Sequence, residues 1–167
     1  MKKAVWSSIL AVAGVLVLSD MAFAQAATAN AAVAVSAAVN PKAKLSLGAA
    51  NISFSDTSNP DDAPVLDATP FSVEVKSRTS AAGNVTLTVR ATGNLTSGAN
   101  SIGIANLTWL ADGDLVAGTS SSAAEVSVGS WTGSGTRTGN QTYRLANSWD
   151  YAIGNYTVTL NYTLTAP

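Results

Sequence analysis

Side chains that commonly do chemistry are scarce in this sequence. Its 167 residues include no His and no Cys, so Ser-His and Cys-His pairs are missing, as are the usual ligands of zinc, haem and iron–sulfur clusters. Nine Lys and Arg residues balance ten Asp and Glu residues, without the basic stripe typical of nucleic-acid binding. The sequence therefore predicts a protein that is not an enzyme, holds no cofactor and binds no nucleic acid.

Carboxylates are the remaining candidates for chemistry. Asp112-Gly113-Asp114 could offer oxygen ligands to calcium, but the full binding-loop pattern is absent. A carboxylate pair for glycoside hydrolysis could be drawn from Asp112, Asp114, Glu125 and Asp150, although no motif positions them. Asp is common in turns, where it bonds its own backbone. Structural turns are therefore favoured, and no metal or catalytic residue is predicted.

Aromatic residues gather in the last third of the chain and are candidates for binding. Exposed rings often form sugar- or protein-binding faces, and the candidates here are Trp131, Trp149 and Tyr151. The alternative is packing in the core or at sheet ends, which is favoured because large exposed apolar patches are uncommon in soluble monomers. Trp109 continues an alternation that starts at Leu107 and is expected to be buried.

The first 24 residues read as a secretory signal peptide. Lys2 and Lys3 precede an apolar stretch from Ile9 to Leu18, and Ala22-Phe23-Ala24 places small residues where signal peptidase reads them. A membrane anchor is the alternative, but the apolar stretch is too short to span about 30 Å of hydrocarbon. We expect cleavage after Ala24 and export to the periplasm, cell surface or medium, with no transmembrane segment in the mature chain.

The mature chain is expected to begin with a flexible leader. Residues 25–32 are rich in Ala and offer little side-chain area to bury. Val33, Val35, Ala37 and Val39 then fall on alternate positions before Pro41, which predicts a first strand that ends at the proline. Residues 33–167 contain no obvious linker, so a single domain is predicted.

Apolar side chains alternate along the rest of the chain, which indicates strands. The stretches are Leu45-Leu47, Ile52-Phe54, Phe71-Val73-Val75, Val85-Leu87-Val89, Leu107-Trp109, Val126-Val128 and Tyr156-Val158-Leu160-Tyr162-Leu164. Turn-forming clusters separate them: Asp56 to Pro64, Ala82-Gly83-Asn84, Gly93-Asn94, Ser97-Gly98, Asp112-Gly113-Asp114, Gly133-Ser134-Gly135 and Gly139-Asn140. Short strands between such turns predict an all-β fold, an antiparallel immunoglobulin-like sandwich. Without Cys, packing and sheet hydrogen bonds must hold it together.

The two ends of the mature chain resemble a known family. The stretch from Val33 to Pro41 and the stretch from Gly154 to Leu164 are similar to the first and last strands of bacterial surface-fibre subunits of the chaperone-usher type, and of related spore-coat-like secreted sandwiches. Fimbrial subunits tend to carry a glycine that opens the last strand, as Gly154 would here. Ala166 stands where they favour a tyrosine, and the absent disulfide points to the cysteine-free fimbrial branch.

The resemblance implies assembly by strand addition. In that family each subunit lacks a strand, which a neighbour's N-terminal extension supplies, so Val33, Val35, Ala37 and Val39 would fill a neighbour's groove. The implied partners are copies of itself or related surface subunits, and a periplasmic chaperone. The alternative is an ordinary first strand paired within its own domain, favoured because an open groove leaves edges exposed. The leading functional hypothesis is an exported structural or surface-assembly protein; the alternative is a secreted carbohydrate- or protein-binding module.

Overall fold

The computed structural model describes residues 32–167, so the predicted signal peptide and most of the leader lie outside the described residues. Within the described part, Ala38–Pro167 forms one compact unit, separate from the residues before it. We call this unit the β-domain. All its strand pairs are antiparallel, and the one helical element of the described part is a short 3-10 turn, Ile104–Asn106. The prediction of an all-β protein is therefore confirmed.

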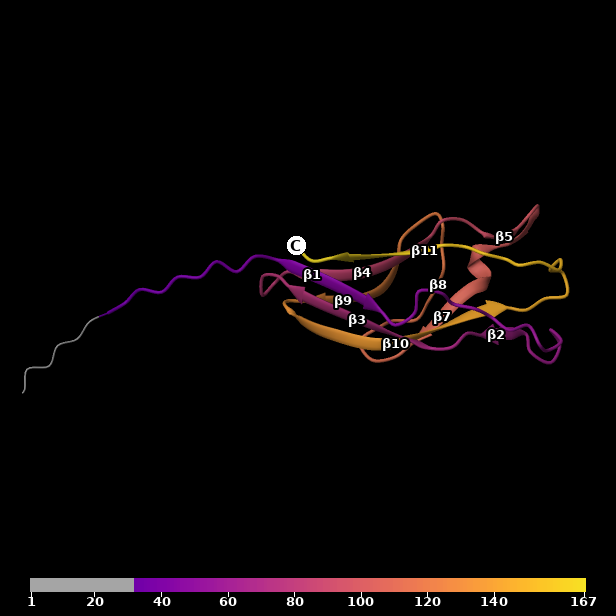
Figure 1. Ribbon diagram of the computed structural model, residues 1–167, viewed down its shortest axis with the longest axis horizontal. Coiled ribbons are helices and arrows are strands. Elements are labelled where there is room, and N and C mark those ends of the chain that lie inside the picture. The colour runs from indigo at the N-terminus through magenta and orange to yellow at the C-terminus, as the bar shows by residue number, and fades with distance from the viewer. Residues whose placement is uncertain (1–31) are drawn as a thin grey trace, which may run out of the picture. The chain divides into compact units, whose positions relative to one another are not determined.

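The larger sheet is built around the longest strand of the described part. β10 (Gly135–Ala146) lies between β3 (Phe71–Arg78) and β7 (Leu107–Ala111), with β1 (Lys42–Leu47) at one edge and β8 (Gly118–Thr119) at the other (Figure 1). The short β2 (Val65–Asp67) also pairs with β10. In this sheet, β1 has β3 as its one partner strand.

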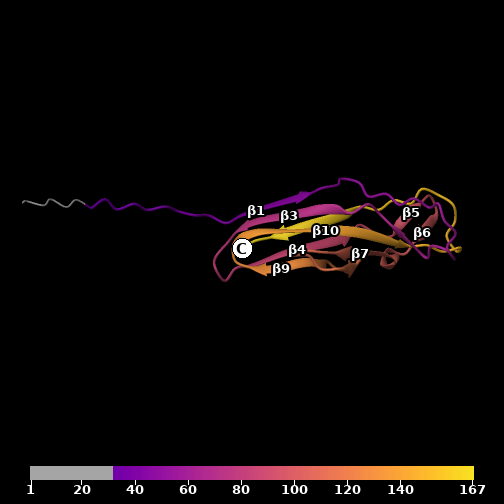
Figure 2. The same ribbon diagram turned by 90° about the horizontal axis from the view of Figure 1, so that it is seen from below.

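The smaller sheet has three strands in the order β11 (Leu160–Thr165), β4 (Asn84–Ala91) and β9 (Val126–Thr132). A separate hairpin joins β5 (Leu95–Ser97) to β6 (Asn100–Ile102). Figure 2 shows β1 and β3 on one side of the β-domain and β4 and β9 on the other. The C-terminal strand β11 is thus an edge strand, hydrogen-bonded along β4.

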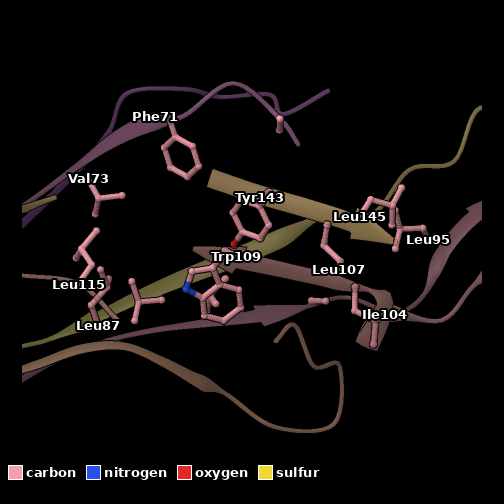
Figure 3. Close-up of a cluster of buried hydrophobic side chains, with 14 of the residues drawn as sticks. Phe71, Val73, Leu87, Leu95, Ile104, Leu107, Trp109, Leu115, Tyr143 and Leu145 are labelled. Carbon is pink, nitrogen blue, oxygen red and sulfur yellow. The ribbon is translucent and has the colours of Figure 1, made fainter. Parts of the chain in front are cut away.

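Alternating side chains from both sheets meet in one core. Val73 and Val75 of β3 and Val85 and Leu87 of β4 are at most 1% exposed, which follows from the period-two pattern of their strands. Large aromatic side chains fill the centre, with the Tyr143 ring 6.1 Å from the Phe71 ring and 5.8 Å from the Trp109 ring (Figure 3). Trp109 is 1% exposed, as its alternation predicted.

The predicted first strand is wrong. Residues 32–41 form no strand, and β1 begins at Lys42, immediately after Pro41. The side chains of Val33, Val35 and Val39 are 85%, 89% and 65% exposed, and Ala37 is exposed as well. A strand requires a neighbouring ladder for its N–H and C=O groups, and alternation alone does not provide one.

Three other local predictions need correction. Ile52 and Phe54 do not form a strand, although both pack half-buried against the core. The last strand is shorter than predicted, because residues 156–159 make an isolated bridge, Thr157 to Thr96, before β11 starts. Gly139-Asn140 is not a turn but the middle of β10. A Cβ at Gly139 would collide with the Asp112 carbonyl oxygen, so this glycine permits a close approach of backbones.

Candidate functional site

The two edge strands β1 and β11 lie near each other without forming a ladder. Between the segment that follows β1 and the segment that leads into β11 is a groove of about 380 Å³. We call it the edge groove. One wall is formed by residues 47–54 and the other by residues 156–162, and the floor includes Phe71, Leu107 and Tyr143. Both walls come from predicted strand regions that the structure shows to be partly irregular.

The inner side chains beside the edge groove are incompletely covered. Along β11 and the residues before it, alternate side chains face inward but are only half-buried: Tyr156, Val158, Leu160, Tyr162 and Leu164. The inner side chains of the neighbouring β4, by contrast, are at most 4% exposed. The difference follows from position, because β4 has a partner strand on both sides and β11 has one.

The backbone of β11 is open on the side of the groove. An edge strand presents N–H and C=O groups that can template another strand, and Leu160–Thr165 has β4 as its one hydrogen-bonded neighbour. An apolar groove beside an open backbone edge is suited to accept an extended segment with apolar side chains at alternate positions.

A buried polar chain links the two sheets at the base of the groove. The Tyr162 hydroxyl of β11 donates to the Gln141 Oε1 atom of β10 at 2.6 Å and accepts from the Tyr143 hydroxyl at 2.8 Å. Gln141 is wholly buried, and its Nε2 atom has no partner among the described residues. Burial raises the pKa of Tyr143 to about 12 and raises the pKa of Tyr162 as well. Both phenols are therefore neutral and serve as structural hydrogen-bonding groups.

The aromatic candidates do not form one site. Trp149 is 66% exposed and lies with the half-buried Tyr151 around a hollow of about 790 Å³, which we call the end hollow. Trp131 is elsewhere, on β9, where its indole ring covers Gly129 and its Nε1 donates to the Asp114 carbonyl oxygen at 3.2 Å. Trp131 is thus placed as a packing residue at a sheet edge.

The acidic candidates bond to the protein itself. Asp112 Oδ1 accepts from the Asn140 backbone N–H at 2.6 Å, and Asp114 Oδ2 accepts from the Thr138 N–H at 2.9 Å. The Asn140 backbone N–H, with help from its side-chain amide, lowers the pKa of Asp112. Residues 32–167 contain no group of three or more potential metal ligands. The two carboxylates fasten the β7–β8 turn to β10, in agreement with the turn interpretation.

Sequence reasoning identified alternating side chains on both walls of the edge groove but did not predict the groove itself. The alternations at Leu45-Leu47, at Ile52-Phe54 and from Tyr156 to Leu164 were each predicted to be ordinary strands. The alternation of Ile52 and Phe54 correctly predicts that both side chains face the core, but it does not show that their backbone joins no ladder.

Comparison with known proteins provides no further guide. No family model matches this sequence, and no curated protein matches it. Within residues 32–167, no helix has the length and apolar character needed to cross a membrane. Function must therefore be inferred from the groove and its neighbouring residues.

Proposed function

We propose that this protein is an exported, non-enzymatic surface-assembly subunit that associates with its own kind by β-strand addition. Its two sheets would be an immunoglobulin-like sandwich with one strand position open, and the segment Val33–Val39 of one copy would fill the edge groove of another. The observation that carries the proposal is β11, whose inner face is half-buried and whose backbone edge is open.

The proposed donor matches the groove in length and pattern. Four small apolar side chains alternate over seven residues in the donor, from Val33 to Val39. Four half-buried side chains alternate over seven residues on the acceptor, from Val158 to Leu164. At about 3.3 Å per residue both stretches are roughly 20 Å long. Paired antiparallel, Val33 would lie opposite Leu164 and Val39 opposite Val158.

The donor is better suited to a neighbour's groove than to its own. To lie beside its own β1, the segment would have to reverse direction between Val39 and Lys42, within Asn40-Pro41. A two-residue type I′ turn would need positive φ at Pro41, whose ring fixes φ near −65°. A type II′ turn would need positive φ at Asn40, which the following proline restricts to extended conformations with negative φ. A reversal there is strongly disfavoured, whereas a segment that continues straight into another copy needs none.

Composition and compartment support this function. Charged residues make up only 11% of the chain, which provides little electrostatic protection against edge pairing. The signal peptide would deliver the chain to the periplasm, where a chaperone could cover the open edge before assembly. The alternative, a carbohydrate- or protein-binding module, loses support because Trp131 is separate from Trp149 and Tyr151.

A donor-blocked variant tests the proposal. In the mature chain, Val33→Asp with Val35→Asp places charges on two side chains that are exposed in the isolated chain. We expect unchanged folding and complete loss of concentration-dependent polymers, measured by light scattering and analytical ultracentrifugation. The control is Val116→Asp, at a valine that is 48% exposed and lies outside the donor, and this variant should still polymerise.

Complementation in trans completes the test. A synthetic peptide of residues 30–41, added in excess to the donor-blocked variant, should bind and raise its melting temperature, whereas a peptide with both aspartates should not. A wild-type mature chain that stays monomeric at high concentration, or a variant that ignores the wild-type peptide, would contradict strand addition.

A further inference from the structure

The two ends of the β-domain differ in chemistry. One end, which we call the leader end, is where β1 begins and β3 and the C-terminus finish, at Lys42, Arg78 and Pro167 (Figure 1). The opposite end, the far end, holds the loop before β2 and the loop between β10 and β11. The far end exposes large apolar side chains and the leader end pairs like charges, and neither arrangement stabilises an isolated domain.

The far end exposes large apolar side chains. Ile153 is 99% exposed and Trp149 is 66% exposed, both in the loop between β10 and β11. They lie at the end hollow, which shares Ile52, Phe54 and Tyr156 with the edge groove. The apolar surface thus continues from the groove onto the far end.

Charge divides between the same two ends. The first and third rungs of the β1–β3 ladder, counted from the leader end, pair Lys42 with Arg78 and Lys44 with Lys76, all exposed. Like charges directly opposite one another destabilise a sheet, and Glu74, at 2.9 Å from Lys76, offsets this in part. The far-end loops instead carry exposed acidic residues: Asp56, Asp61, Asp62 and Asp150. One end is therefore basic and the other acidic.

The direction of strand addition would bring unlike ends together. β11 runs from the far end toward the leader end, since Leu160 pairs with Ala91 and Thr165 pairs with Thr86 near the start of β4. A donor antiparallel to β11, the pairing found throughout this domain, would emerge at the acceptor's far end. Only Asn40 and Pro41 separate Val39 from β1, and three extended residue steps span at most about 11 Å. The donor's leader end must then lie against the acceptor's far end.

We propose that the far end is a docking surface for the leader end of a second copy of this chain, with Trp149 and Ile153 buried in the contact and the acidic loops facing the Lys42–Arg78 and Lys44–Lys76 rungs. This inference rests on the proposed strand addition. Because the contact joins different surfaces of identical subunits, it is a head-to-tail contact, which generates an open fibre where the rotation between copies does not close a ring.

Single-cysteine labelling tests the contact, because the chain has no Cys of its own. Ile153→Cys is introduced both into the mature chain and into the donor-blocked variant. In the donor-blocked variant saturated with the 30–41 peptide, the cysteine should react freely with a maleimide. In polymers of the mature chain, it should lose that reactivity. The matched control is Leu110→Cys, half-exposed on β7, which should react in both states. Protection of Ile153→Cys alone supports end-to-end docking.

The other outcomes separate the two proposals. If polymers form and the peptide binds but Ile153→Cys stays reactive, strand addition stands and end docking is wrong. If both cysteines become protected, copies pack side by side, and end docking is again wrong. If neither polymers nor the peptide complex form, strand addition itself is refuted, and end docking with it.

Salt and charge reversal test the electrostatic part. Elongation should slow roughly tenfold from low to high ionic strength, since rim charges act mainly on association rate. Lys42→Glu with Arg78→Glu should slow elongation at low salt, and Asp61→Lys with Asp62→Lys in the same chain should restore it. Wild-type elongation by the first double variant would overturn the assignment of these charges.

Discussion

The buried chain of Tyr143, Tyr162 and Gln141 allows a quantitative prediction about the base of the groove. Tyr162→Phe keeps the ring and removes one hydroxyl, which now donates to Gln141 Oε1 at 2.6 Å and accepts from Tyr143 at 2.8 Å. Two buried groups would lose their partner at once. Gln141 would be affected most, because it is wholly buried and its Nε2 atom already lacks a partner among the described residues.

The expected loss follows from the number of orphaned groups. A buried donor or acceptor left unsatisfied costs about 1–3 kcal/mol, so two such groups should lower the free energy of unfolding by about 2–6 kcal/mol. For a domain of this size, 1 kcal/mol corresponds to roughly 3 °C in melting temperature. Tyr162→Phe should therefore melt about 6–18 °C below the wild type.

A double-variant cycle in the donor-blocked background checks the cause. Gln141→Leu removes the amide that Tyr162→Phe orphans, so the double variant should be more stable than the sum of the single changes predicts. Tyr156→Phe is the control, because the Tyr156 hydroxyl donates to Ala152 in an exposed loop, and it should change stability by less than about 1 kcal/mol. Additive losses in urea unfolding, or an unchanged Tyr162→Phe, would refute the reasoning.

The other predictions concern pH and close packing. Because burial raises the pKa of Tyr143 to about 12, the unfolded chain ionises first, near pH 10. The contribution of Tyr143 to the free energy of unfolding is therefore complete below about pH 10 and is lost as the pH rises toward about 12. Unfolding curves measured between about pH 9 and 12 should show this loss, and a stability that does not fall over this range would contradict the prediction. The pKa of Asp112 is lowered in the folded protein. The stabilising effect of its carboxylate is therefore present above about pH 4 and is lost as acid protonates the folded form. In urea titrations, the stability of Asp112→Asn should no longer show this acid dependence. A Cβ at Gly118 would collide with the Trp109 ring, whereas one at Gly93 would meet open space. Calorimetry should therefore show that Gly118→Ala lowers the free energy of unfolding by about 1–3 kcal/mol. The matched control, Gly93→Ala, should change it little.

Strands could be predicted where burial is decided locally. Val85, Leu87 and Val89 alternate with polar residues, and the structure buries all three. The middle of β10 escaped prediction because Gly139 and Gln141 carry no apolar signal. Gly139 is required by the nearby Asp112 backbone, and Gln141 is tolerated inside because Tyr162 bonds it. Both causes depend on residues distant in sequence, which a period-two pattern does not contain.

The edge groove illustrates the same limit at the level of the site. The alternation along residues 156–164 and along residues 33–39 is visible in the sequence, and both were singled out. Whether a strand is central or at an edge depends on sheet order, however, and β11 pairs with β4 some 75 residues earlier in the chain. Alternation predicts which side chains face inward, but it does not indicate how completely neighbouring strands cover them.

The proposed strand addition and the proposed end docking would complement each other energetically. Burying three valines of the donor would contribute about 5–9 kcal/mol, and roughly six ladder hydrogen bonds about 3–9 kcal/mol. Ordering seven exposed residues costs about 7–14 kcal/mol of backbone entropy, so the donor alone has a net gain of only a few kcal/mol and an isolated peptide must be added in large excess to saturate the groove. The contact between unlike ends would then supply the margin that favours a whole subunit over its own leader peptide. It would also make each addition depend on the correct end of the incoming copy.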